Sequence, residues 1–540
     1  MTDGSALVPV SPYGPFIELA LTVHELAGNG RFAEAIAAAN EFQAIARAFG
    51  DEKTVDFLIQ GRMFAHQYHG DFAGAMAVGL GLLDRQRAAG NVLGEAKTLA
   101  DLAQLGVQSN RTAQGILHLA RAGLLLETTS RRNERYASAL AAYGQAANTA
   151  GLYEVAAAAY EQVLAEHAAY ASSPGSYLAH RYLELLLTWG FRLDHLGHGL
   201  EAGFRLRRAV AVASGWLAEH PGTGPDGAPG PVDTWEIRAV LALARAKLGE
   251  AGEATALAAP LVLPLREHRL AGGAWAVHLA LGIAHRRLGD HPAARRELLA
   301  ARDWCGLGGW ADDELIVAHE LAVLAAQADG GPAARDLLAA LDVQNRLLGR
   351  QRMQQLTALH HARDREELAL ERAGTQAALL RDPLTGLGNR RQFDQLMTEL
   401  DTGAAAGPVS LLILDVDKFK AVNDTYSHTA GDALLRRIGA VLAACCRTGQ
   451  DVPIRYAGDE FTIFCYADLP AAVEVAERIR AAVAGAEVDG IAPGAPVSVS
   501  IGVAARADGM TAAELFQAAD ANLYRAKRGG RNRVAASAAD

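Results

Sequence analysis

The strongest constraint on the fold of this chain is a repeat of about 40 residues that runs through its first two thirds. A Gly-containing turn followed by an Ala-rich helical pattern begins at Gly30 and recurs clearly at Gly70 and Gly289. Looser copies begin at Asn110, Gly151, Gly197 and Gly249, and an eighth begins at Asp329. Successive starts lie 40, 40, 41, 46, 52, 40 and 40 residues apart. A period of this length indicates a solenoid of stacked helical units.

The composition of the turns explains why helices are expected to end and restart there. Glycine suits the left-handed conformation that ends a helix, and a neighbouring Asp or Asn caps the next one. The 52-residue interval contains the Pro- and Gly-rich stretch 221–231, which predicts an inserted surface loop. This region resembles the tetratricopeptide (TPR) family, with units longer than the usual length of about 34 residues. A HEAT-like solenoid is an open alternative.

Residues 1–344 are therefore predicted to form a TPR-like helical repeat domain, with no catalytic constellation in its sequence. A concave helical surface of this kind suits the binding of a peptide, a protein or a small ligand. The alternative is a scaffold for dimerisation and spacing that binds no ligand.

Residues 345–380 are charged and poor in Gly and Pro, which predicts a long connecting helix. A candidate heptad seam includes Leu348, Leu359 and Leu380, but more than half of its positions are polar or alanine. Two interpretations stay open: a signalling helix that dimerises modestly as a parallel coiled coil, and a single helix that packs on the solenoid.

The pattern changes abruptly after Arg381 and predicts an α+β domain over residues 381–540. Strands are expected at 409–415, 453–456, 461–466 and 497–503, and helices at 431–446 and 471–483. The second and third strands are separated only by residues 457–460, which predicts a tight hairpin turn.

Three carboxylates are expected to meet at one edge of this sheet. Asp415 ends a buried strand, and Asp459 and Glu460 lie on the hairpin turn. Clustered acids that stay ionised favour a divalent metal, and ligation by oxygen alone selects magnesium or manganese. Basic residues that suit a polyphosphate lie nearby: Lys418, Lys420, Lys527, Arg528, Arg531 and Arg533. Carboxylates that hold metal on a phosphoryl group are typical of polymerases and cyclases, whereas a solvated acidic turn is the simpler alternative.

The same region carries four motifs in order, and together they cover residues 381–535. They are residues 382–391, residues 415–424 continued by His428, Gly431 and Asp432, residues 457–461, and residues 523–527 with 530–532. These motifs resemble those of GGDEF domains, the diguanylate cyclases. The resemblance implies a multidomain protein in which an all-α TPR-like solenoid precedes an α+β palm-like domain of the nucleotidyl cyclase type.

The resemblance also implies an activity and a set of site residues. Two such domains, each with one GTP, form a homodimer and produce cyclic di-GMP and two pyrophosphates. The implied metal ligands for Mg or Mn are Asp415, the Val416 carbonyl, Asp459 and Glu460, and the implied catalytic residues are Glu460, which assists deprotonation of the 3′-hydroxyl, Asp459 and Asp415. The implied substrate contacts are Asn423 and Asp432 for guanine, Lys420, Lys527 and Arg531 for phosphates, and Phe419 and Gly458.

Three positions depart from the family pattern. Ala457 stands in place of the first Gly of the hairpin motif, and we expect normal or reduced activity rather than none. Ser427 stands where Gly is usual, which would be strained if the backbone needed a positive φ. Residues 448–451 occupy the frame of the product-inhibition motif, but Arg447 is displaced from it by one position. The resemblance therefore predicts no tight product inhibition at this site.

Composition limits the remaining classes of function. With 51 Lys and Arg against 61 Asp and Glu, the net charge of −10 argues against a nucleic-acid or polybasic membrane partner. No apolar window approaches a membrane span of about 18–20 residues; four scattered Cys and the lack of a signal peptide predict a cytoplasmic protein. The leading hypothesis is a cyclase regulated by its repeat array. The alternatives are a catalytically degenerate GGDEF domain that acts as a GTP-binding interaction module, and a pure binding scaffold.

Overall fold

The computed structural model describes residues 14–170, 176–220, 232–268, 270–308, 311–328, 330–402, 407–447, 450–486, 490–491, 493 and 497–538. The predicted loop 221–231, the predicted eighth start at Asp329, and Thr448 and Gly449 lie outside these residues. The chain divides into two compact units, residues 1–367 and 368–540. No helix in the described ranges combines the length and the apolar content needed to cross a bilayer.

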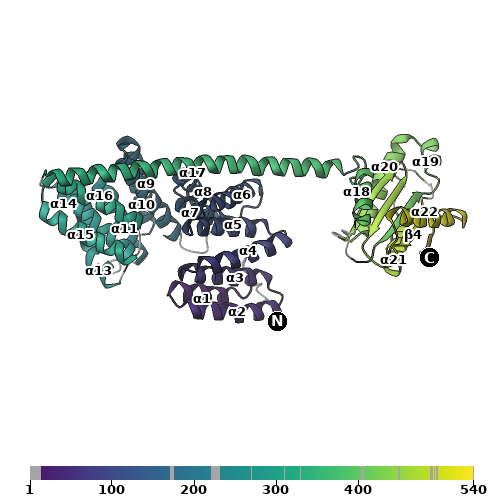
Figure 1. The fold of residues 1–540 in the computed structure, drawn as a ribbon, viewed down its shortest axis with the longest axis horizontal. Helices are drawn as coiled ribbons and strands as arrows, with labels where there is room; N and C mark the ends of the chain where they lie inside the picture. The colour runs from purple at the N-terminus through teal and green to yellow at the C-terminus, as the bar shows by residue number, and fades with distance from the viewer. Residues whose placement is uncertain are drawn as a thin grey trace, which may run out of the picture. The chain divides into compact units, whose positions relative to one another are not determined.

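The first unit is built from helices. They are α1 (Ile17–Gly28), α2 (Phe32–Ala48), α3 (Glu52–Tyr68), α4 (Phe72–Ala88), α5 (Val92–Gln108), α6 (Thr112–Thr128), α7 (Glu134–Thr149), α8 (Tyr153–Tyr170), α9 (Ser176–His195), α10 (Gly199–Glu219), α11 (Val232–Leu248), α12 (Ala251–Ala258), the 3₁₀ turn η1 (Ala259–Leu261), α13 (Val262–Glu267), α14 (Ala271–Arg287), α15 (His291–Gly308) and α16 (Ala311–Ala328). Figure 1 shows successive helices of this unit packed in pairs. The predicted all-α repeat region is confirmed.

The periods contain two helices each, except that the period starting at Gly249 contains α12, η1, α13 and α14. The turns between the helices follow from glycine chemistry. Gly30 and Gly70 have φ of 76° and 83°, as predicted for helix-ending positions. Gly50 and Gly90, with φ of 69° and 63°, form a second turn halfway through each of the first two periods. The sequence reading missed these half-period turns. Asn110 takes the same left-handed role with φ of 60°.

Small residues allow the helices to pack closely. The core of the unit consists mainly of buried Ala and Leu side chains. Gly115 on α6 illustrates the limit, because a Cβ there would lie 2.7 Å from the backbone oxygen of Ala103 on α5. Side chains larger than hydrogen would therefore force these two helices apart.

The helix α17 (Pro332–Leu379) contains most of the predicted connecting segment 345–380 and begins earlier, at Pro332. Up to Glu366 the predicted seam faces the repeat array, where Leu359 and Ala362 are only 1% and 5% exposed. Arg352 Nε donates to the Gly151 carbonyl at 3.0 Å, and Arg363 pairs with a carboxylate of α6. In the first unit this helix therefore packs on the solenoid along the face that was predicted as a coiled-coil seam.

The second unit contains one five-stranded sheet with the order β2-β3-β1-β4-β5. The strands are β1 (Ser410–Val416), β2 (Asp451–Ala457), β3 (Glu460–Cys465), β4 (Val499–Ala505) and β5 (Val534–Ala538). β1 pairs antiparallel with both β3 and β4, β2 and β3 form a hairpin, and β5 runs parallel to β4. Four strands were predicted. β5 was missed because the small residues of 534–538 lack an alternating apolar pattern.

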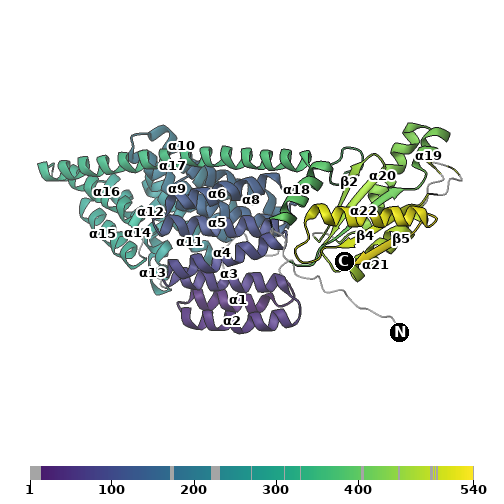
Figure 2. The ribbon, with the colours of Figure 1, turned by 45° about the vertical axis from the view of Figure 1, so that its right-hand side comes forward.

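Helices cover both faces of this sheet. They are α18 (Arg390–Asp401), α19 (Phe419–Thr425), α20 (His428–Cys445), α21 (Leu469–Ala484) and α22 (Ala512–Arg528). α20 and α21 share one apolar core with the sheet, and α18 and α22 share the other. Figure 2 shows α22 lying across β4 and β5. The arrangement confirms the predicted α+β domain.

Candidate active site

The strand register brings two of the predicted carboxylates side by side. Asp415 near the end of β1 lies directly opposite Glu460 at the start of β3. Asp459 belongs to the turn just before β3, and its carbonyl accepts a hydrogen bond from the Val416 N–H at 3.2 Å. All four residues implied as metal ligands therefore lie at one edge of the sheet.

Burial and mutual repulsion make Asp415 and Glu460 hard to ionise. Burial raises the pKa of Asp415, and the charges of Asp459 and Asp417 raise it further, while Lys527 opposes the shift. Burial and then Asp415 also raise the pKa of Glu460. The Nζ of Lys527 lies 2.7 Å from Asp415 Oδ2. The site therefore holds more negative charge than its one close lysine neutralises.

The oxygen donors of this edge fit a divalent cation. Carboxylates and a backbone carbonyl are the ligands that Mg²⁺ and Mn²⁺ prefer, and a dication would relieve the repulsion that raises the two pKa values. The side-chain oxygens of Asp415, Asp459 and Glu460 do not all lie within 4.8 Å of one another in the described structure. Asp415, Asp459 and Glu460 would hold the ion, with the Val416 carbonyl as a further donor.

The hairpin turn is fixed by contacts that the sequence reading did not identify. Gly458 has φ of 51°, which favours glycine, and its carbonyl accepts from Arg455 Nε at 2.9 Å. Arg455 Nη1 also lies 3.3 Å from both carboxylate oxygens of Asp382. Burial alone would raise the pKa of Asp382, but hydrogen bonds from Thr385 and the Arg455 charge lower it. The 382–391 motif thus anchors the turn that carries Asp459.

The residues implied for guanine lie at the junction of α19 and α20. A Cβ on Gly431 would lie 1.9 Å from Asn423 Oδ1 and 3.1 Å from the Phe419 ring, so glycine makes room for both side chains. Asn423 Oδ1 is buried and has no hydrogen-bond partner among the described residues. Asp432 is exposed on the next position of α20. An unpaired amide oxygen is costly to bury, and a base with N–H donors would satisfy it.

The three implied phosphate ligands lie in different settings. Lys420 on α19 and Arg531 after α22 are exposed, whereas Lys527 is paired with Asp415. Arg531 has φ of 63°, and the next residue, Asn532, donates its N–H to Asp417 Oδ2 at 3.0 Å. Asp417 is 6% exposed and also accepts from the hydroxyls of Ser498 and Ser500 at 2.7 Å each. Asp417, to which the sequence reading gave no role, ties the closing segment to the end of β1.

Two of the three departures have a clear local structure. The strain considered for Ser427 does not occur, because its φ of 166° is extended; its hydroxyl caps α20 by accepting from Ala430 N–H at 3.1 Å. Ala457 is exposed at the end of β2, beside a register shift. In the inhibition frame, Arg447 binds the Asp451 carboxylate through Nε and Nη2 at 3.0 and 2.8 Å. Asp451 is therefore already occupied by an arginine of its own chain.

Another group with metal-ligand side chains lies in the first unit. His195, His319 and Glu320 are buried with ligand atoms within 4.8 Å of one another. The two imidazole rings stack at 3.7 Å, so their nitrogen lone pairs do not converge on one point. Glu320 already pairs with Lys247 and Arg286. This geometry favours a structural ion network over a metal site.

Comparison with known proteins assigns the second unit to a family. Residues 379–533 match the family described as diguanylate cyclase, GGDEF domain. These residues are a GGDEF domain. Over 159 residues the chain is 40% identical to diguanylate cyclase DgcM of Escherichia coli. The aligned region covers 29% of this chain and 38% of that protein. Over 165 residues it is 42% identical to the response regulator PleD of Caulobacter vibrioides, spanning 29% and 36%.

A solved structure also resembles the GGDEF domain. The coiled coil and GGDEF domain of DgcB from Caulobacter crescentus, in complex with c-di-GMP, is 30% identical; the match covers 32% of this chain and 94% of that one, with a TM-score of 0.30. The chain spans less than half the length of DgcM and PleD. The similarity to these proteins concerns the GGDEF domain.

Proposed function

We propose that this protein is a diguanylate cyclase that condenses two GTP into cyclic di-GMP and two pyrophosphates. The observation that carries the proposal is the cross-strand pair Asp415 and Glu460, an acidic edge with raised pKa values. Among the described residues, Lys527 is the one cation that pairs with it. A metal–nucleotide complex would supply the missing positive charge. The relatives named as diguanylate cyclases support the same activity.

The residues would divide the work as follows. Asn423 and Asp432 orient the guanine, and Lys420, Lys527 and Arg531 bind phosphate oxygens. Glu460 accepts the proton of the 3′-hydroxyl of one GTP as the hydroxyl oxygen attacks the α-phosphorus of the second GTP. The bond between that phosphorus and the pyrophosphate leaving group breaks. Mg²⁺ or Mn²⁺, when bound, stabilises the charge that develops on the phosphoryl oxygens.

Each GGDEF domain would hold one GTP, so a complete cycle requires two chains as a homodimer. We propose that the repeat array of the first unit regulates how the two domains meet, by binding a ligand or a partner. The packing of α17 on this array, through Arg352 and Arg363, supports such a route because α17 continues into the second unit. A change on the array would shift the population of productive dimers.

Incubation of the full chain with GTP and Mg²⁺ or Mn²⁺, followed by chromatographic detection of cyclic di-GMP, tests the activity. We expect turnover that rises more than linearly with protein concentration and is lost in Glu460→Gln, while Glu477→Gln, an exposed glutamate on α21, keeps it. GTP binding without product at any protein concentration would instead favour the degenerate, GTP-binding module.

The Arg447–Asp451 pair leads to an expectation about regulation by product. Because Asp451 is saturated by Arg447 and no arginine stands at position 448, we expect no tight binding of cyclic di-GMP at this site. Isothermal titration with cyclic di-GMP measures this directly. Submicromolar binding that Asp451→Ala abolishes would contradict it.

A further inference from the structure

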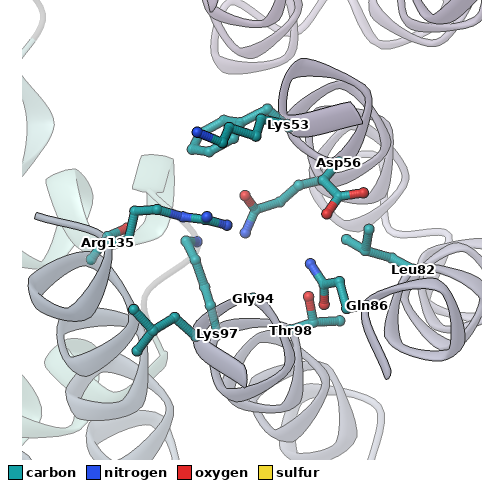
Figure 3. Close-up of a pocket in the computed structure, with 12 residues that line it drawn as sticks. Lys53, Asp56, Leu82, Gln86, Gly94, Lys97, Thr98 and Arg135 are labelled. Carbon is teal, nitrogen blue, oxygen red and sulfur yellow. The ribbon is translucent and has the colours of Figure 1, made fainter. Parts of the chain in front are cut away.

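The first unit contains a cavity of about 40 Å³ between α3, α4, α5 and α7. Its lining includes Lys53 and Asp56 from α3, Gln86 from α4, Lys97 from α5 and Arg135 from α7. Figure 3 shows the charged ends of Arg135 and Lys97 directed toward each other, with the Lys53 amine on the same side of the cavity. Three cations from three helices thus gather around one small space.

The charges around this cavity are only partly balanced by the protein. Its one lining carboxylate, Asp56, accepts from Arg85 Nε at 2.7 Å and so belongs to another ion pair. Lys97 lies 3.6 Å from Asp101, whose Oδ2 also accepts from Gln60 Nε2 at 2.6 Å. In the described part of the chain, Lys53 and Arg135 form no ion pair with a carboxylate.

The side chain of Gln86 adds hydrogen-bonding capacity that the protein leaves unused. Gln86 is only 5% exposed, and its Oε1 is buried without a hydrogen-bond partner among the described residues. Figure 3 shows its amide beside Thr98, at the wall of the cavity. An acceptor next to three cations suits an anion that also carries a hydroxyl. A monoprotonated phosphate group has both properties, whereas an ionised carboxylate has only the charge.

We propose that this cavity binds a phosphate group, either inorganic phosphate or the terminal phosphate of a small molecule. A space of this volume accepts a group of a few heavy atoms and excludes a whole nucleotide. A wider groove of about 460 Å³, which shares Lys97 and includes Phe64 and Tyr68, adjoins it and would hold the remainder of a larger ligand. This inference rests on the proposed regulatory role of the repeat array and assigns it a class of ligand.

Isothermal titration of the full chain with inorganic phosphate, and separately with phenyl phosphate, tests the site. The variants are Arg135→Gln and Lys53→Gln; the exposed Lys53 limits any effect on folding. Arg111→Gln, which removes an exposed cation outside the cavity, is the matched control. Phosphate contacts elsewhere, including the GGDEF domain, are common to all four proteins and cancel in the comparison.

We expect each cavity variant to weaken binding of at least one probe roughly tenfold or more, and the control to leave it unchanged. Equal binding of both probes would identify free phosphate as sufficient, and tighter binding of phenyl phosphate would identify a phosphate-bearing molecule that uses the groove. No binding by the wild type, or equal binding by wild type and both cavity variants, would overturn the inference.

Assay of cyclic di-GMP in the same preparations separates this inference from the proposed function. A wild type that makes product but binds phosphate no better than Arg135→Gln would refute the cavity and leave the cyclase intact. A wild type that makes no product, yet loses phosphate binding in Arg135→Gln, would refute the cyclase and support the cavity.

Discussion

Two clusters of partly or fully buried charge, one in each unit, are built in opposite ways. In the first unit Glu320 is 1% exposed and pairs with both Lys247 and Arg286. Burial would raise its pKa, but the two cations more than offset this and lower it. In the second unit Asp415 and Glu460 face each other with Lys527 as their close cation, and both pKa values are raised.

The difference teaches how to separate structural charge from functional charge. A carboxylate whose cations come from its own chain holds helices together and has no need of a ligand. Acids that repel each other at the edge of a sheet lower the stability of the folded protein. Such an arrangement is expected where a cation arrives with the substrate. Substitutions in the first cluster should therefore change stability, and substitutions in the second should change catalysis.

The largest expected effect on stability is that of Glu320→Gln. Loss of this charge leaves Lys247 and Arg286 buried without their shared partner, so the free energy of unfolding should fall by about 3–5 kcal/mol. Urea unfolding followed by tryptophan fluorescence reports on this unit, because all six Trp lie between Trp189 and Trp310. Glu253→Gln, at an exposed position of α12, is the control. A change below about 1 kcal/mol would show that the network is not structural.

Asp415→Asn should act on catalysis instead. The asparagine keeps the size of the side chain but removes a charge that we propose holds the metal, so the rate of cyclic di-GMP formation should fall on the order of a hundredfold to a thousandfold. Asp424→Asn, an exposed acid in the same motif, should keep the rate. The melting temperature should change little, because the native charge is already disfavoured by burial and by its neighbours. A well-folded variant with full activity would remove Asp415 from the site.

Sequence reasoning recovered what local patterns encode. Gly30 and Gly70 marked helix ends, and the apolar run before Asp415 marked a buried strand whose end carries an acid. Contacts between distant segments were not accessible in this way: Arg455 meets Asp382 across 73 residues, and Asp417 meets Asn532 across 115. The pairing of Lys527 with Asp415 likewise depends on how α22 packs against the sheet. These contacts are set by tertiary packing, not by periodicity.

Acidification should affect the two units with opposite signs. Burial lowers the pKa of His24 and His319 to about 4, so the unfolded chain takes up protons below pH 6.5 that the folded unit does not. Stability of the first unit is therefore lost as pH falls below 6.5, by up to about 1.4 kcal/mol per pH unit for each such histidine. His118 and His195 shift in the same direction, and His180 shifts in the opposite one.

The acidic edge of the second unit has the reverse dependence. Because the folded pKa values of Asp415 and Glu460 are raised, their contribution is fully present below the ordinary values and is lost as pH rises through the folded ones. Between pH 7 and pH 5 we expect the first unit to lose stability by tryptophan fluorescence. Over the same range the protection factors of the β1 and β3 amides, which correct for the slower intrinsic hydrogen exchange at low pH, should rise or stay constant. Destabilisation of both units on acidification would contradict their opposite pH dependence. Mg²⁺ should abolish the stability that the second unit gains at low pH, because it would hold Asp415 and Glu460 ionised.

The smallest expected effects are those of alanine substitutions at Gly115 and Gly431. Each glycine leaves room for a neighbouring group, but the neighbour is backbone at Gly115 and a side chain at Gly431. At Gly115 a Cβ would meet backbone, so Gly115→Ala should destabilise the first unit. At Gly431 it would meet the end of the Asn423 side chain at 1.9 Å, and that side chain can turn away. Gly431→Ala should therefore raise the KM for GTP roughly five- to tenfold through loss of the proposed hydrogen bond from guanine to Asn423, while the higher helix propensity of alanine maintains stability. An unchanged KM with a lowered melting temperature would assign Gly431 to packing and weaken the guanine site at Asn423.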